Sequence, residues 1–177
     1  MARLLNGSAT QIAPLALGAL FALVLPGRDS RGEDGYELWL RYRPEPDAAL
    51  RADFTAYCGG GVVAPDRPVI AAARAELERA LTAILPGTGT GGLVYLGTRA
   101  DHPAVAAAVS PEELALLGDE GFVLRAGEWN GRRVLVVAGT TDRGVLHGTF
   151  ALLRHLQLGQ PLAGWSLADA PRVHERI

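Results

Sequence analysis

The sequence predicts an α/β fold of the α+β kind: a two-layer sandwich in which a mixed sheet carries helices packed on one face. Three observations predict it. Strand-like and helical segments alternate along the chain, two long segments have the apolar periodicity of amphipathic helices, and an Asn-Gly pair separates two strand-like runs. The chain has 177 residues, 49% of them hydrophobic and 20% charged, which is enough to bury one core.

The first half of the chain contains one strand, a short second one and the first long helix. Residues 36–42 alternate apolar and polar side chains, which predicts a half-buried strand that ends before Pro44 and Pro46. After the glycine run 59–61, residues 62–64 predict a short strand. A helix is expected over about 67–85, begun by Pro68 and stopped by Pro86-Gly87. Its apolar stripe comprises Ile70, Ala73, Leu77, Leu81 and Ile84.

The second half begins with a buried strand at 93–96, followed by two short helical pieces at 101–109 and 110–117. Ser110-Pro111-Glu112-Glu113 is a good helix start, with a capping oxygen followed by proline and two acids. The strongest local signal is a hairpin, with strands at 121–129 and 132–138 around Asn130-Gly131, the preferred type I′ turn.

The last predicted element is a helix over about 143–158, and Thr140, Thr141 and Asp142 offer N-cap oxygens before it. Gly144 and Gly148, four residues apart, would let this helix lie close to the sheet. The apolar face is expected to comprise Val145, Leu146, Thr149, Phe150, Leu153 and Leu156.

Motifs that would bind a nucleotide or another anion are weak. The glycine-rich run 87–92 stands between a helix and a strand, the reverse of the dinucleotide-binding order, and the chain has no lysine for a P-loop. The strand–Gly139–helix junction could bind an anion at the helix N-terminus, but Asp142 would repel a phosphate, and helix capping explains the same residues.

Titratable and metal-ligating residues form no recognisable catalytic set. Cys58 is the only cysteine, which excludes an internal disulfide, and we interpret it as a small residue in a glycine loop. The histidines are too far apart for a shared metal site, with His147 and His155 eight residues apart on one helix; the others are His102 and His174. We therefore assign no catalytic, substrate-binding or metal residue and no cofactor. A net charge of −2 with scattered arginines excludes a basic nucleic-acid footprint.

The N-terminal segment differs from the rest of the chain. Residues 12–25 carry no charge and lie between Arg3 and the charged run 28–34, as in the n- and h-regions of a signal peptide. They are too few to span a bilayer comfortably, Pro14 interrupts them, and no small-residue cleavage site follows Leu25. Secretion and a cytoplasmic location both stay open, as do an upstream start-codon assignment and an extra core helix. The expected organisation is a signal-like segment and polar linker at 1–32, an accessory domain at 33–160 and the start of a linker at 161–177.

Three stretches together resemble the N-terminal domain of α-glucuronidases of glycoside hydrolase family 67. They are EDGYELWLRY at 33–42, GDEGFVLR at 118–125 and GTTDRGVLHGTFALLR at 139–154. The segments 160–162 and 170–173 resemble that family's passage out of the domain. Accessory domains of β-N-acetylhexosaminidases carry a pattern similar to the third stretch, and His147 replaces the tyrosine usual there, but Tyr36 and Pro171 favour family 67.

The resemblance implies an α/β sandwich that precedes a catalytic (β/α)₈ barrel, and this barrel would be the domain's partner. It also implies a process, the inverting removal of 4-O-methyl-glucuronic acid from xylo-oligosaccharides, with the acid and base on the barrel. A barrel needs about 250 residues, more than the 177 residues of this chain. The resemblance therefore assigns no catalytic residue to this chain, and we expect the chain to be inactive alone. The alternatives are a free-standing carbohydrate-binding or protein-interaction module, in which Trp39, Trp129 and Trp165 could stack on sugars, and a hexosaminidase-like accessory domain.

Overall fold

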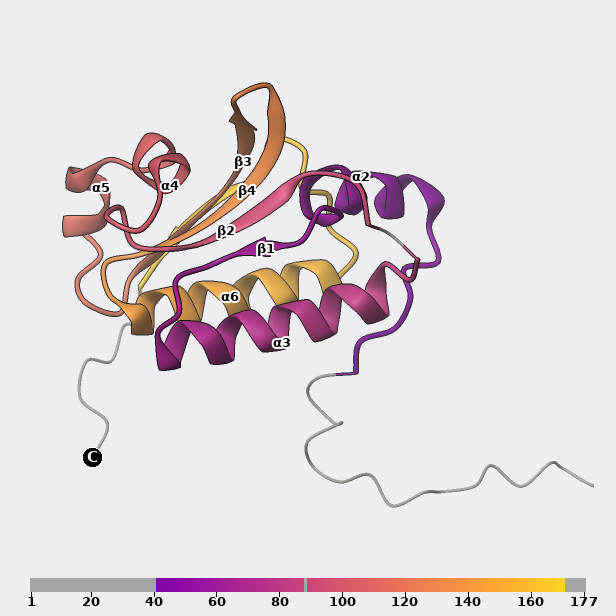
Figure 1. Ribbon diagram of the computed structural model, residues 1–177, viewed down its shortest axis with the longest axis horizontal. Helices are drawn as coiled ribbons and strands as arrows, with labels where there is room; N and C mark the ends of the chain where they lie inside the picture. Colours follow the sequence, from indigo (N-terminus) through magenta and orange to yellow (C-terminus); the bar gives the residue numbers. More distant parts are fainter. Residues whose placement is uncertain (1–40, 88, 171–177) are drawn as a thin grey trace, which may run out of the picture. The chain divides into compact units, whose positions relative to one another are not determined.

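Five strands form one mixed sheet in the computed structural model, which describes residues 41–87 and 89–170 (Figure 1). The order across the sheet is β1-β2-β4-β3-β5. Strands β1, β2 and β4 are parallel, whereas β3 is antiparallel to both β4 and β5. The bounds are β1 Val62–Val63, β2 Leu93–Gly97, β3 Phe122–Trp129, β4 Arg132–Gly139 and β5 Ser166–Asp169. The expected α/β class is confirmed.

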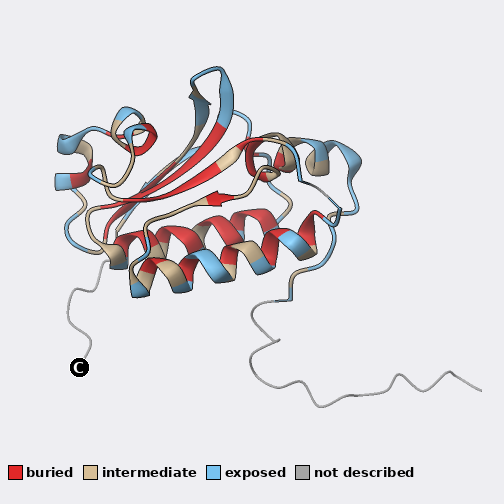
Figure 2. Ribbon diagram, in the orientation of Figure 1, coloured by how far each residue is buried: buried red, intermediate tan, exposed pale blue. Residues whose placement is uncertain are grey.

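Two long helices, α3 (Pro68–Ile84) and α6 (Asp142–Gln157), lie side by side on one face of the sheet (Figure 1). The predicted stripe of α3 is buried as expected, and Figure 2 shows buried residues along both helices. These side chains form the main core with alternate residues of the central strands. The fully buried members of this core include Ile70, Leu77, Val94, Leu124, Leu135 and Leu152.

Close approach of α6 to the sheet depends on its two glycines, as predicted. A Cβ on Gly144 would lie 2.2 Å from the carbonyl oxygen of Gly121, and one on Gly148 would lie 2.9 Å from a methyl carbon of Val137. The predicted apolar face of α6 is partly wrong, because Phe150 is 41% exposed and Leu146 is only half-buried. The buried side of α6 instead includes Leu152 and His155. The observed buried face is therefore rotated around the helix axis relative to the predicted one.

A helix that the sequence analysis missed, α2 (Ala48–Cys58), packs its buried residues into the same core. Its signal was present. Asp47 follows the prolines, and its carboxylate accepts hydrogen bonds from the amides of Ala49 (2.7 Å) and Leu50 (3.1 Å). The buried residues Phe54, Tyr57 and Cys58 then recur at helical spacing.

The predicted hairpin is confirmed. Asn130 and Gly131 have φ values of 50° and 73°, both in the left-handed region that a type I′ turn requires. The ladder pairs Trp129 with Arg132 at the turn and Phe122 with Gly139 at the far end. This end of the ladder lies at the same edge of the sheet as the ends of β1 and β2.

Two short helices, α4 (Pro103–Ala108) and α5 (Pro111–Ala115), cover part of the opposite face of the sheet. Both were predicted, and Ser110 caps α5 by accepting a hydrogen bond from the Glu113 amide at 3.1 Å. The expectation of helices on one face therefore holds for the long helices, while a smaller second core lies under α4 and α5. Its fully buried members include Val105, Val123, Val136 and Ala138.

Several expectations concern the ends of the chain. The segment 1–32 and most of the strand predicted at 36–42 lie outside the described residues, and Arg41 and Tyr42, which are described, belong to no strand. The range 161–177, expected to begin a linker, contains β5 and the fully buried Leu162, so the sheet continues past residue 160. Among the described helices, none has the length and hydropathy to cross a bilayer.

Candidate functional site

A charged cluster lies where the parallel strands end, the edge at which open α/β sheets usually bind ligands. Arg67 follows β1 and forms the N-cap position of α3, Asp101 follows β2, and Asp142 is the first residue of α6 after β4. The sheet order therefore places three residues that are distant in sequence at one edge.

The guanidinium of Arg67 holds both carboxylates in forked hydrogen bonds. Its Nη1 and Nη2 donate to the two oxygens of Asp101 at 2.6 and 2.8 Å, and its Nε and Nη2 donate to Asp142 at 2.9 and 2.8 Å. Asp101 also accepts from the amide and hydroxyl of Thr98, at 2.7 and 2.8 Å. Arg67 thus fastens the β2–α4 loop to the start of α6.

This cluster is electrostatically satisfied. The hydrogen bonds from Arg67, aided by those from Thr98, hold the pKa of Asp101 well below its usual range, although burial opposes the shift. A carboxyl group with a lowered pKa stays ionised at neutral pH and cannot act as a general acid. The arrangement is therefore a structural clamp.

The capping predicted at the start of α6 is wrong in its details. Thr141 occupies the N-cap position, but its side chain makes no capping hydrogen bond. Its hydroxyl donates instead to the carbonyl of Asp119, and the hydroxyl of Thr140 donates to the carbonyl of Leu114 at 3.3 Å. Asp142 is engaged by Arg67. The side-chain oxygens predicted to cap the helix therefore bond to residues distant in sequence. The carboxylate of Asp142 lies at the helix N-terminus, where an anion would otherwise bind.

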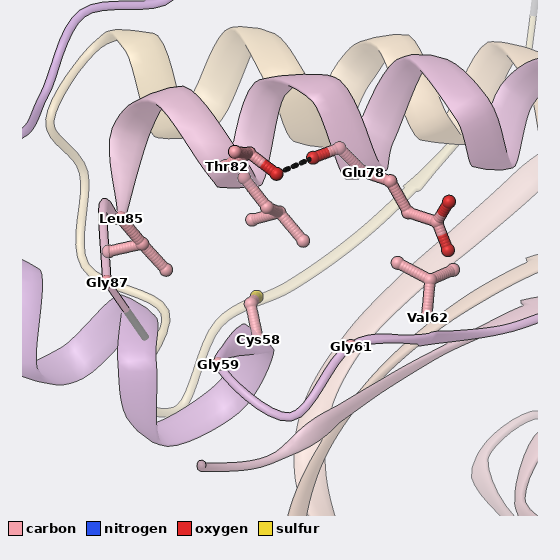
Figure 3. A pocket seen from close by; sticks show the side chains of 9 residues that line it. Cys58, Gly59, Gly61, Val62, Glu78, Thr82, Leu85 and Gly87 are labelled. Atoms are coloured by element: carbon pink, nitrogen blue, oxygen red, sulfur yellow. Dashed lines mark hydrogen bonds between the residues drawn. The ribbon is translucent and has the colours of Figure 1, made fainter. Parts of the chain in front are cut away.

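A hollow of about 390 Å³ lies between the C-terminal half of α3 and the α2–β1 loop (Figure 3). Its polar groups are already engaged: Arg74 donates to the carboxylate of Glu78 at 2.7 Å, and the hydroxyl of Thr82 donates to the Glu78 carbonyl at 2.8 Å. Cys58 is 2% exposed, and burial, with a smaller effect of Asp53, raises the pKa of its thiol far above the ordinary value. A neutral buried thiol is no nucleophile, which fits a structural role, but Cys58 is the last residue of α2 and not part of a glycine loop as expected.

Two of the described histidines, His102 and His155, serve capping and packing, whereas the Nδ1 of His147 is buried without a hydrogen-bond partner among the described residues. His102 Nδ1 accepts a hydrogen bond from the Ala104 amide at 3.0 Å and so caps α4. His155 stacks on Trp165 with ring centroids 3.7 Å apart, and its Nε2 lies 3.1 Å from the Pro161 carbonyl oxygen. His147 lies on α6, and His174 lies outside the described residues. Within residues 41–87 and 89–170, no three His, Cys, Asp or Glu side chains gather as a metal would require.

The three tryptophans have separate environments. Trp39 lies outside the described residues, and Trp165 is occupied by its stacking on His155. Trp129 is half-buried at the hairpin end of β3 and packs against the smaller core. Trp129 also lines a hollow beside α4.

Comparison with known proteins bears on the chain as a whole. Two of the solved structures that are similar to part of it are enzymes. One is a GH138 enzyme targeting pectin rhamnogalacturonan II, with 18% identity and a TM-score of 0.42 over 64% of this chain. The other is a family GH115 4-O-methyl-α-glucuronidase with specificity for decorated arabinogalactans, with 22% identity and a TM-score of 0.45 over 66%. The matched regions are 15% and 17% of those chains. No curated protein matches the sequence.

The family comparison is specific. A model described as the N-terminus of glycosyl hydrolase family 67 matches residues 38–152, which include β1 to β4 and the first part of α6, through Leu152. The match covers well over half of the chain and agrees with the resemblance seen in its sequence motifs. The chain belongs to the family of glycosyl hydrolase family 67 N-terminal domains.

Proposed function

We propose that this chain is the non-catalytic N-terminal domain of an α-glucuronidase that acts in the breakdown of 4-O-methyl-glucuronoxylan. In this proposal a separate (β/α)₈ domain binds the xylo-oligosaccharide and supplies the acid and base. The family match over residues 38–152 is the observation that carries the proposal.

The chemistry of the charged cluster supports a non-catalytic role. An inverting glycosidase uses an acid with a raised pKa and a carboxylate base, about 6.5–9.5 Å apart with room for water between them. In the Arg67 clamp, Asp101 and Asp142 are both bound to one guanidinium, and the pKa of Asp101 is lowered rather than raised. Asp101 therefore lacks the property that defines the acid, and the carboxylate of Asp142 is engaged by the same guanidinium.

The edge of the sheet where the parallel strands end is the surface that we assign to contact with the catalytic domain. Register places Gly139 of β4 opposite Phe122 of β3, and Phe122 opposite Asp169 of β5, so β5 delivers the chain to this edge. An open hollow of about 330 Å³ lies here, with Pro111, Leu114, Ala115, Gly139 and Thr140 among its lining residues. Beside it, Leu116 is 88% exposed. Apolar surface of this kind favours contact with another domain.

An activity assay tests the proposal. The 177-residue chain is incubated with xylo-oligosaccharides that carry 4-O-methyl-glucuronic acid, in parallel with the native protein purified from its source. We expect release of the acid, with inversion, by the native protein and none by the chain alone. Release by the chain alone would overturn the non-catalytic role, and an inactive native protein would overturn the assignment to an α-glucuronidase.

A further inference from the structure

A third hollow, of about 200 Å³, lies on the less covered face of the sheet between α4 and the β3–β4 hairpin. In Figure 1 the hairpin extends past α4 at this side of the sheet. Small side chains of α4 form one wall, and Val134 and Val136 of β4 form part of the floor. The volume is below the roughly 300–1,000 Å³ of sites for drug-sized ligands, so the hollow suits a single small ring. The α4 wall comprises Ala104, Ala107 and Ala108.

Gly127 keeps the floor of this hollow open. It lies on β3 opposite Val134, and a Cβ built on it would meet no atom within 4 Å. Its φ is outside the left-handed region, so the backbone does not require glycine here. Every side chain at this position would project into the hollow, because alternate residues of β3 share one face.

An aromatic ring and an ion pair border the same floor. Trp129, two residues after Gly127, is half-buried and lines the hollow. Arg125, two residues before Gly127, donates through Nη2 to Glu113 at 2.6 Å and through Nη1 to the carbonyl of Ala108. Glu113 neutralises Arg125, and the other charged residue of the lining is Glu128, so the border offers donors and acceptors without an excess of positive charge.

We propose that this hollow binds one neutral pyranose ring, stacked on Trp129 with its hydroxyls toward the Arg125–Glu113 pair. A sugar ring has an apolar C–H face that fits an indole, and hydroxyls that both donate and accept hydrogen bonds. The absence of net charge at the pair favours a neutral sugar over a uronic acid. This inference does not depend on the proposed function.

The test is a titration of the ¹⁵N-labelled 177-residue chain with methyl β-D-xylopyranoside and, separately, methyl β-D-glucuronopyranoside, followed by ¹H–¹⁵N NMR. We expect the Trp129 indole and Gly127 amide signals to shift and saturate with the neutral sugar, with a Kd on the order of 1–10 mM. The charged sugar should bind more weakly. Saturation by both sugars with equal affinity would overturn the assignment to a neutral ring.

Two variants and one control locate the effect. Gly127→Val fills the hollow without a backbone conflict, and Trp129→Ala removes the stacking surface; each should weaken binding about tenfold or more. Trp165→Phe retains an aromatic ring against His155 and should bind as the original chain does. Thermal unfolding confirms that each variant is folded, and Gly127→Val is expected to be at least as stable as the original. Flat titrations of the original chain, or equal shifts in Gly127→Val, would refute the site.

Discussion

Replacing Arg67 with methionine tests the clamp at the edge of the sheet. The variant keeps an unbranched apolar side chain in place of the arginine stem and leaves Asp101 and Asp142 without their shared cation. Exposed ion pairs contribute about 0–1 kcal/mol, whereas breaking a buried pair costs about 3–5 kcal/mol. The side chain of Arg67 is 37% exposed and that of Asp101 only 12% exposed, so the burial of the clamp lies between that of an exposed pair and that of a buried pair. We expect Arg67→Met to lower the free energy of unfolding by about 1–3 kcal/mol.

Urea unfolding followed by circular dichroism measures the loss of free energy of unfolding. The pH dependence of that loss shows whether the ionised carboxylates cause it. Since the pKa of Asp101 is lower in the folded chain than in the unfolded chain, its contribution is present above about pH 4 and disappears as pH falls further. The difference between the original chain and Arg67→Met should therefore narrow from about pH 7 toward about pH 3. Arg67→Lys keeps the positive charge but not the forked hydrogen bonds, so it should lose less free energy of unfolding than Arg67→Met.

A loss below about 0.5 kcal/mol for Arg67→Met at neutral pH would refute the reasoning, since it would place the clamp among exposed pairs of negligible effect. A larger loss that stays constant between about pH 7 and about pH 3 would also refute it, because the effect would then come from packing of the side chain and not from the ionised carboxylates.

Three further predictions follow from packing and exposure. Gly144→Ala should destabilise the chain by about 2–4 kcal/mol in urea unfolding, because its Cβ would lie 2.2 Å from the Gly121 carbonyl oxygen. Gly127→Ala is the matched control with open space around its Cβ, and an equal loss in both variants would contradict the packing argument. Cys58 should react with a thiol reagent at neutral pH only after the chain is unfolded, because burial raises its thiol pKa; rapid labelling of the folded chain would contradict this. Leu116→Ser should change the stability of the 177-residue chain by less than about 0.5 kcal/mol, because the side chain is exposed. It should lower the thermal stability of the full protein, and an unchanged full protein would remove Leu116 from the proposed domain contact.

The elements that the sequence predicted well are those with strong local signals. The helix over 67–85 has a continuous apolar stripe between a starting and a stopping proline, and Asn130-Gly131 permits a single kind of tight turn. The helix α2 carried a usable signal in Asp47 and its buried stripe, which the two prolines before it obscured. Phe150 was predicted to be buried and is exposed. Which side of α6 is buried depends on where the sheet lies, and the helical spacing of apolar residues alone does not give that position.

The charged cluster could not be predicted, because it depends on strand order. Arg67 is 34 residues from Asp101 and 75 residues from Asp142, and only the parallel arrangement of β1, β2 and β4 brings them together. Local sequence also offered Asp142 a plausible role as a helix cap, and the tertiary partner prevails over that role. The family resemblance, by contrast, depended on motifs in the sequence itself and is confirmed by the family match.

The native mass of the protein in its source cells tests the central claim, that this chain is one domain of a larger glycosidase, most directly. Intact-mass measurement with peptide mapping should find a protein well above 18.6 kDa, with peptides that continue past Ile177 into a catalytic domain. A native product at or slightly below 18.6 kDa would contradict the account, because the domain would then function without a covalently attached barrel.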